Sequence, residues 1–204
     1  MSLLIENVES APALCVFGAG HIGSALAALA AGCGFRVTVV DERPEWADAA
    51  RFPRAVVHCR APEEYAREVS LAAGDYVVVA THDHGLDDRL VEELLRRPLA
   101  FLGMIGSASK QRKFSLRLQA RGFPDADIAR LRTPLGVAIG ATTPEEIAVS
   151  AMAEIIAVRR GAPVGSPSVP PARHGEETAG SRPAAARSPA PAPEKPSAQE
   201  VTPR

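Results

Sequence analysis

The sequence predicts an α/β fold of the doubly wound type, with a mostly parallel sheet of about six strands. Two observations carry the prediction. Short apolar runs rich in Val, Leu and Phe alternate with helical patterns as far as about residue 160, which is the order of elements in a parallel sheet. The first run leads into a glycine-rich turn and then into an alanine-rich helix, a typical opening of such a fold.

Each expected element follows from its local pattern. The strands are expected at 13–18, 35–41, 55–59, 75–81, 99–105 and 136–139, and the helices at 20–31, 44–51, 62–70, 85–97, 107–121 and 144–160. The strand runs are apolar on successive residues, as helices on both faces of a sheet require. Pro62 is followed by two acids that complement a helix dipole. Thr143 to Glu146 form a capping sequence, so the last helix is expected to begin at 144.

The composition divides the chain into three parts: an N-terminal extension at 1–12, a nucleotide- or cofactor-binding domain at 13–161, and a Pro/Ala-rich tail at 162–204. The tail holds ten of the eighteen prolines and lacks Leu, Ile, Met, Phe, Tyr and Trp, so it is expected to be a disordered C-terminal tail. The formal net charge of −1 gives no indication of bulk nucleic-acid binding.

The sequence contains no signal for targeting or membrane insertion. The first residues lack a basic region, and no apolar run approaches the roughly 18 residues of a membrane span. A cytoplasmic location is therefore expected, without membrane association. The cysteines Cys15, Cys33 and Cys59 are too far apart for a metal knuckle and are expected to be small buried residues.

The glycine-rich turn Gly18-Ala19-Gly20-His21-Ile22-Gly23 predicts a Rossmann-like phosphate site. Gly18 would permit the tight turn, Gly20 would let the backbone approach a phosphate, and Gly23 would let the helix pack closely. The phosphate would lie at the N-terminus of the helix, near His21. The alternative is that these glycines serve only the geometry of the turn, since the same fold hosts many functions.

Asp41 ends the second expected strand, close to where an acid that binds ribose is expected after a glycine turn. It favours NAD, or another ligand with a free 2′-hydroxyl group, over NADP. Arg43 leaves two possibilities open. Its guanidinium could reach a 2′-phosphate, or it could pair with Asp41 or Glu42 at the surface.

A polar turn, Thr81-His82-Asp83-His84-Gly85-Leu86-Asp87-Asp88-Arg89, follows the fourth expected strand, where doubly wound sheets bind ligands. It holds two histidines and three aspartates within seven residues. Its side chains could ligate a metal, act as acid and base, or bind a polar heterocycle. The alternative is that an Asp or Thr caps the next helix and the imidazoles are solvated. We assign no metal site here.

The fifth expected strand leads into a second glycine turn, with Gly106, Ser107 and Lys110. Gly106 would permit close approach, Ser107 would cap the helix, and Lys110 would supply a charge for phosphate or carboxylate. Equally, the cations of this helix could be a solvated face.

Taken together, several motifs resemble the XdhC family in order and spacing, over residues 14 to about 161. They are GAGHIG at 18–23, VVDER at 39–43, RFP at 51–53, THDH at 81–84, GMIGS at 103–107 with Lys110, and PLGVAIGATTPEEIAVS at 134–150. The resemblance implies a maturation factor that binds molybdenum cofactor (molybdopterin) and delivers it to xanthine dehydrogenase or a related molybdoenzyme. The three loops around Gly20, His82–His84 and Gly106–Lys110 would line the cofactor pocket.

The resemblance also implies partners: a xanthine dehydrogenase-type molybdoenzyme, proteins of cofactor synthesis, and a second copy in a homodimer. Typical full-length members carry a further N-terminal domain, whereas about thirteen residues precede the first expected strand here. We expect either that another polypeptide supplies that domain or that this chain has a narrower task.

Two further functions remain open. One is an NAD-dependent oxidoreductase in which His82 or His84 acts as general acid or base. The other is a regulatory module that senses NAD. The sequence has no evident pair of nucleophile and base, so an accessory protein is expected rather than an enzyme, and no catalytic residue is assigned.

Overall fold

The computed structural model describes residues 11–164, and within this range only the backbone of residues 108–110. The described residues all belong to one compact unit. Apart from residues 162–164, the tail that is predicted to be disordered lies outside the described residues, as does nearly all of the predicted N-terminal extension.

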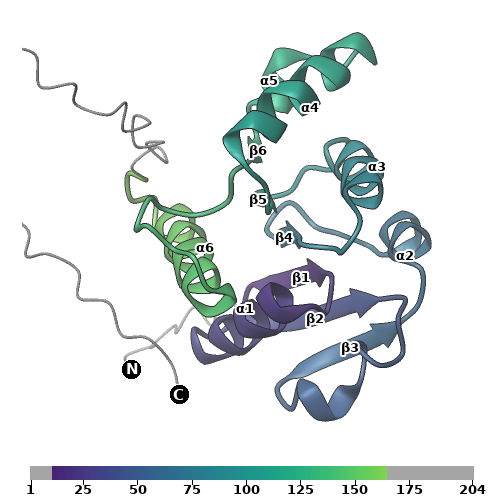
Figure 1. Cartoon of the computed structure of the whole chain (residues 1–204), viewed down its shortest axis with the longest axis vertical. Coiled ribbons are helices and arrows are strands. Elements are labelled where there is room, and N and C mark those ends of the chain that lie inside the picture. Colours follow the sequence, from purple (N-terminus) through teal and green to yellow (C-terminus); the bar gives the residue numbers. More distant parts are fainter. Residues whose placement is uncertain (1–10, 165–204) are drawn as a thin grey trace, which may run out of the picture. The chain divides into compact units, whose positions relative to one another are not determined.

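A wholly parallel sheet of six strands forms the centre of this unit (Figure 1). The strands are β1 (Ala13–Phe17), β2 (Arg36–Asp41), β3 (Ala55–Cys59), β4 (Tyr76–Val79), β5 (Phe101–Met104) and β6 (Leu131–Arg132). Their order is β3-β2-β1-β4-β5-β6, and every neighbouring pair is parallel. This is the order of a Rossmann fold, in which the direction of winding reverses between β1 and β4. The predicted fold class is confirmed.

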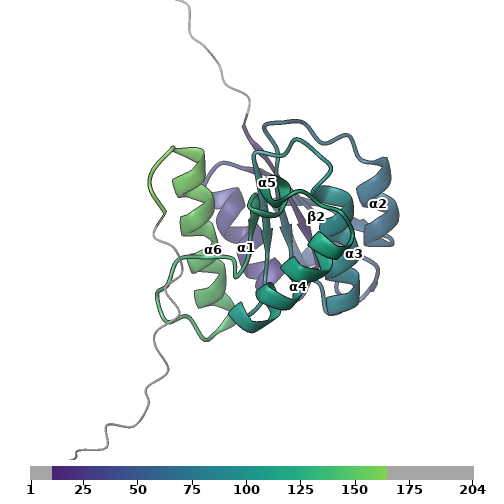
Figure 2. The same ribbon diagram turned by 90° about the horizontal axis from the view of Figure 1, so that it is seen from above.

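Helices cover both faces of the sheet (Figure 2). One face carries α1 (His21–Gly32) and α6 (Pro144–Arg159), and the other carries α2 (Pro62–Glu68), α3 (His84–Leu94) and α4 (Ala108–Ala120). Successive residues of β1 serve opposite faces: Leu14 and Val16 pack with α1 and α6, whereas Cys15 and Phe17 pack with α2 and α3. Burial on both faces explains why the strands are apolar on successive residues.

The capping sequence before α6 forms as predicted. Glu146 N–H donates to Thr143 Oγ1 (3.2 Å), and Thr143 N–H donates to a Glu146 side-chain oxygen (3.0 Å). This reciprocal pair satisfies backbone groups that the first turn would leave without partners. In residues 11–164, no helix has the length and apolar character needed to cross a membrane.

The predicted strand at 136–139 is wrong, and the sixth strand lies five residues earlier, at β6. The backbone of 136–139 bonds to α6 rather than to β5. Gly136 N–H donates to the buried Glu154 carboxylate (2.7 Å), and Val137 N–H donates to Ser150 O (3.3 Å). Gly136 also has a φ of +115°, outside the β region.

The predicted helix at 44–51 is also wrong, because only one turn of 3₁₀ helix forms, at Ala49–Arg51. The Asp48 carboxylate accepts a hydrogen bond from Ala50 N–H (2.9 Å) and so starts a new turn in the middle of the expected helix. A short helix that the sequence did not predict, α5 (Asp125–Ile128), follows α4.

Candidate functional site

The glycine turn lies at the carboxyl edge of the sheet, where winding reverses, and it packs against the end of β4. Gly18 N–H donates to Val40 O (2.8 Å), and Gly18 has a φ of +112°. A Cβ at Gly18 would lie 2.2 Å from Ala80 O, and one at Gly23 would lie 1.9 Å from Gly18 O. Both positions therefore require glycine for close backbone contact.

Gly20 differs from these two glycines because it faces open space. Its φ is −65°, which any residue adopts, and a Cβ there would meet nothing within 4 Å. Among the described residues, no side chain caps the N-terminus of α1. The first-turn N–H groups are thus available to an anion, with the helix dipole in their favour. His21 lies beside this opening, exposed, with its ring edge-on to Trp46 at 5.1 Å between centroids.

Asp41 is buried, with 3% of its side chain exposed, and both of its oxygens are fully used. Oδ1 accepts from Arg43 N–H (3.0 Å) and Arg43 Nε (2.9 Å), and Oδ2 accepts from Arg43 Nη2 (2.8 Å) and Ala19 N–H (2.8 Å). Four hydrogen bonds fill the acceptor capacity of a carboxylate. Of the possibilities left open for Arg43, the structure shows pairing with Asp41.

The hydrogen bonds to Asp41 also set its protonation. Burial raises the pKa of Asp41, but the bonds from Arg43 and from Ala19 N–H outweigh burial, so the pKa lies below its usual value of 3.8. Asp41 is therefore a carboxylate at neutral pH that ties the glycine turn to β2.

The polar turn after β4 is organised around the start of α3. The Asp83 carboxylate caps this helix by accepting from Gly85 N–H (2.8 Å), as one of the two alternatives for this turn expects. Thr81 donates twice to Asp87 Oδ1, from its hydroxyl (2.6 Å) and from its N–H (3.1 Å). His82 is exposed.

Asp87 belongs to this site, although the sequence analysis counted it in the polar turn without assigning it a cofactor-binding role. Its side chain is 5% exposed, and its Oδ2 lies 3.5 Å from Nδ1 of His84, whose imidazole is 69% exposed. Burial raises the pKa of Asp87. The signal that could have found it is its spacing: three residues after His84 on a helix, it lies on the same face. The contact with Asp87 therefore positions the imidazole of His84, which faces solvent.

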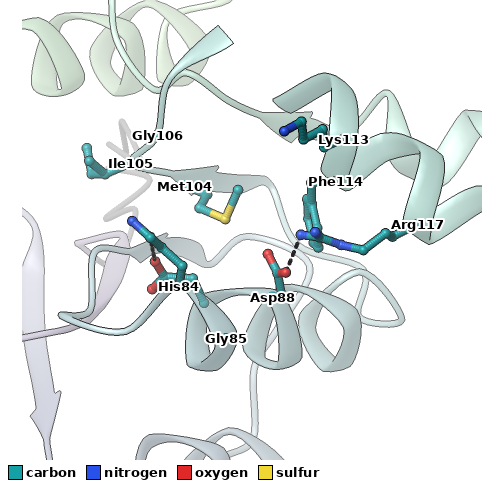
Figure 3. A pocket seen from close by; sticks show the side chains of 10 residues that line it. His84, Gly85, Asp88, Met104, Ile105, Gly106, Lys113, Phe114 and Arg117 are labelled. Carbon is teal, nitrogen blue, oxygen red and sulfur yellow. Dashed lines mark hydrogen bonds and ion pairs between the residues drawn. The ribbon is translucent and has the colours of Figure 1, made fainter. Parts of the chain in front are cut away.

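A pocket of about 230 Å³ opens beside His84, between the start of α3, the end of β5 and α4 (Figure 3). Met104, Ile105 and Phe114 give it an apolar lining. The polar lining carries both signs of charge, because Arg117 forms an ion pair with Asp88 and Lys113 lies nearby on α4. Burial raises the pKa of Asp88. Such a mixture of apolar surface and few polar groups suits a small polar ring.

The structure brings some of the predicted site residues together and separates others. His84 and Gly106 line the same pocket, whereas the turn at 18–23, Asp41 and Arg43 lie on the other side of the β4 end. Ser107 is the N-cap residue of α4. Lys110 lies in the first turn of α4, and its side chain is outside the described part of the structure.

Thr133 is a second residue near the site that the sequence analysis did not assign to cofactor binding. It is buried, and its hydroxyl finds no hydrogen-bond partner among the described residues. A Cβ at Gly106 would lie 3.4 Å from this hydroxyl. The second glycine turn therefore runs directly over an unsatisfied polar atom, which is an unusual arrangement in a native structure. Within residues 11–164, no three His, Cys, Asp or Glu side chains gather to hold a metal ion.

Comparison with known proteins identifies a family and several relatives. Residues 14–155 match the family described as the XdhC Rossmann domain. The chain is 38% identical over 160 residues to a probable xanthine dehydrogenase subunit of Bacillus subtilis, covering 78% of this chain and 46% of that protein. It is 34% identical over 167 residues to the uncharacterized Escherichia coli protein YqeB, covering 81% and 30%.

Among solved structures, the chain resembles a xanthine dehydrogenase from Bacillus halodurans. The TM-score is 0.64 at 32% sequence identity, over 74% of this chain and 43% of that one. This chain therefore spans less than half the length of each of these three relatives.

Proposed function

Because this chain belongs to the XdhC Rossmann-domain family, we propose that it is a maturation factor that binds molybdenum cofactor and assists its insertion into a xanthine dehydrogenase-type enzyme. The names of the Bacillus relatives, a probable xanthine dehydrogenase subunit and a xanthine dehydrogenase, support the choice of partner. Since this chain covers less than half of each of those relatives, the proposal concerns the part of the task that this domain performs.

The observation that carries the proposal is the open space at Gly20 beside the N-terminus of α1, which we call the cradle. Molybdopterin bears a phosphate, and the uncapped N-terminus of α1 offers N–H groups to an anion beside a position where a Cβ would meet nothing. Gly18 and Gly23 hold this cradle in shape through backbone contacts. The chain's own residues thus fit the anionic end of the cofactor.

The pocket at the start of α3 fits the heterocyclic end. Its apolar lining, Met104 and Phe114, would contact the faces of a ring, while Asp88 and His84 could hydrogen-bond to its polar edge. When bound, the cofactor supplies the molybdenum chemistry that the target enzyme uses. This chain has only to bind the cofactor, orient it and release it.

The state of Asp41 favours this proposal over NAD binding. A dinucleotide in a Rossmann fold donates a ribose hydroxyl to an acid at the end of the second strand. Asp41 occupies that place, but Arg43 and Ala19 N–H use its acceptor capacity. A ribose would have to displace Arg43. This would break the charge-assisted hydrogen bonds that the Arg43 guanidinium donates to the Asp41 carboxylate.

Anaerobic calorimetry of the full chain tests the proposal, with molybdenum cofactor and NAD titrated separately. The informative variant is Gly20→Val, because a side chain there fills the cradle without meeting the rest of the fold. We expect wild type to bind the cofactor more tightly than NAD, and Gly20→Val to weaken cofactor binding at least about tenfold, or roughly 1.4 kcal/mol.

Gly32→Val is the matched control, since Gly32 lies at the other end of α1 and a Cβ there also meets nothing within 4 Å. It should bind as wild type does. Unchanged affinity in a folded Gly20→Val protein would remove the cradle assignment. Binding of NAD without binding of molybdenum cofactor would instead point to an NAD sensor or an NAD-dependent oxidoreductase.

A further inference from the structure

A second pocket, of about 250 Å³, opens on the opposite face of the sheet from the pocket beside His84. Figure 2 shows α1 and α3 on opposite sides of the sheet. One wall of the second pocket is α1, where Ser24, Ala27 and Ala28 share a face of the helix. The other wall is the segment 51–55, which leads into β3. The hollow forms because the side chains on this face of α1 are short.

The motif RFP at 51–53, which the proposed function does not use, supplies most of the second wall. Phe52 is 4% exposed and packs into the core on the α1 face of the sheet, so it fixes the position of this segment. Arg51 precedes it and Arg54 follows shortly after it. Both arginines line the pocket.

Backbone carbonyls at the two ends of α1 hold the two arginines. Arg51 Nη1 donates to Ala19 O (3.1 Å) and Trp46 O (2.6 Å). Arg54 Nη2 donates to Ala31 O (3.1 Å). Ala19 precedes α1 and Ala31 lies in its last turn, so these two carbonyls are roughly 18 Å apart along the helix. One guanidinium is thus held towards each end of α1, with apolar side chains between them.

No carboxylate of the described residues neutralises these two cations. Neither arginine forms an ion pair within residues 11–164, and none of the described lining residues is acidic. Arg51 is half-buried, and a half-buried charge is favoured by a counter-ion. An arginine stays protonated at neutral pH, so the pocket attracts an anion at each of its ends.

The donors that Arg51 leaves over are suited to a carboxylate. Its Nη1 is used by two carbonyls, whereas its Nε and Nη2 have no acceptor among the described residues. Nε and Nη2 are the two atoms with which Arg43 holds the carboxylate of Asp41, at 2.9 and 2.8 Å. This pair of parallel N–H groups matches the two oxygens of a carboxylate.

We propose that this pocket binds an elongated dicarboxylate with an apolar middle. One carboxylate accepts hydrogen bonds from Arg51, the other accepts from Arg54, and the middle contacts Ala27 and Phe52. The volume lies below the roughly 300 Å³ at which pockets for drug-sized ligands begin, so the ligand is small. The proposal goes beyond the cofactor function, because it uses neither the cradle at Gly20 nor the pocket beside His84.

Trp46 reports on the Arg51 end of the pocket. It is the single tryptophan of the chain, and its ring centroid lies 4.9 Å from Cζ of Arg51. A carboxylate that binds Arg51 changes the charge beside the indole, so the tryptophan fluorescence of the full chain follows a titration, and calorimetry checks the affinity. Succinate, adipate, suberate and sebacate provide dicarboxylates of increasing length. Hexanoate and octanoate are the matched monocarboxylates.

We expect a dicarboxylate of intermediate length to bind best, at least about tenfold more tightly than the monocarboxylate of equal length, and salt to weaken it. Arg54→Gln should lower the affinity for that dicarboxylate to the affinity for the monocarboxylate. It should leave monocarboxylate binding nearly unchanged, because Arg51 still holds one carboxylate. If Arg54 served only to hold the end of α1, its loss would not abolish the preference for a second carboxylate.

Ala28→Phe tests the location of the site. Ala28 is exposed on α1 and lines the pocket, so the ring should fill the hollow without entering the core and lower the affinity at least about tenfold. Ala153→Phe is the matched control, since Ala153 is exposed on α6 and is not a lining residue. It should bind as wild type does. Thermal melting followed by circular dichroism checks that each variant is folded.

Wild-type protein that shows no saturable binding of any of the four dicarboxylates up to millimolar concentration would overturn the proposal. Equal affinities for suberate and octanoate would refute a site with two cationic ends. Binding that survives Ala28→Phe would place the ligand elsewhere. Gly20→Val should leave dicarboxylate binding unchanged, so the outcome of this experiment is separate from that of the cofactor titration.

Discussion

At the scale of single residues, sequence reasoning predicted backbone geometry better than side-chain partners. Gly18 and Gly23 make the close backbone contacts that their spacing predicts, and Gly20 faces open space. Backbone requirements of this kind are local, so a motif can encode them. The partner of Arg43 could not be predicted, because a guanidinium two residues from Asp41 can reach either the carboxylate or an external phosphate.

The prediction that all three cysteines are buried holds only for Cys15, whose pKa is raised to about 12, chiefly by burial. Cys33 and Cys59 are exposed. Cys33 is the C-cap residue of α1, and Cys59 ends β3, which is the edge strand of the sheet. An apolar sequence pattern does not distinguish an edge strand from a central one.

Asp41→Asn provides a residue-scale test of the tie between β2 and the glycine turn. Because the pKa of Asp41 in the folded state lies below its unfolded value, the charged carboxylate stabilises the fold above about pH 3.8. This contribution is lost as the pH falls from there through the lowered pKa. We expect Asp41→Asn to reduce the free energy of unfolding at pH 7 by about 1.5–3 kcal/mol.

Urea denaturation of wild type and variant at pH 7 and at pH 3 measures the effect, and the difference should shrink at the lower pH. A loss of the same size at both values would mean that packing, rather than the charge of Asp41, is what the substitution disturbs.

At the scale of elements, the sequence predicted helix boundaries that carry explicit capping residues. It did not predict which of two distant segments a backbone N–H group would donate to. Thr143 and Pro144 placed the start of α6 correctly. The segment 136–139 looks like a strand, but its N–H groups donate to Glu154 and Ser150 on α6. The sequence pattern of the segment does not show that its N–H groups will donate to a helix further along the chain instead of to the edge strand of the sheet.

Thr143→Ala tests the cap of α6. Removing the hydroxyl leaves Glu146 N–H without its partner, so the free energy of unfolding should fall by about 1 kcal/mol. Thr143→Ser keeps the hydroxyl and should retain most of the stability. Urea titrations of the three proteins provide the measurement, and equal losses in both variants would assign the effect to the lost methyl group instead.

At the scale of the whole domain, the alternation of elements predicted the parallel sheet and its two covered faces. It could not predict the pocket, because Asp88 on α3 meets Lys113 and Arg117 on α4 only after both helices have packed on the sheet. The two apolar clusters, one on each face, share the same strands. Because the strands lie between the two clusters, unfolding of the strands would expose both clusters to solvent.

The domain should therefore unfold as one cooperative unit. Leu26 and Leu90 are fully buried, one in each cluster, so Leu26→Ala and Leu90→Ala should each cost about 2–5 kcal/mol. Trp46, the single tryptophan, packs against the first cluster, whereas circular dichroism reports helices on both faces. The two signals should give coincident transitions in both variants. Transitions at different urea concentrations would show that the faces unfold separately.

The contact between Gly18 and the end of β4 has a consequence for how such a protein can evolve. Any side chain at position 18 or 23 would strike backbone rather than a movable side chain, so no compensating substitution nearby could make room for it. The exposed residues His82 and His84 carry no such constraint on their side chains. A gene duplicate that acquired a new ligand could therefore change its selectivity through the turn after β4, while the glycine turn stayed as its ancestor had it.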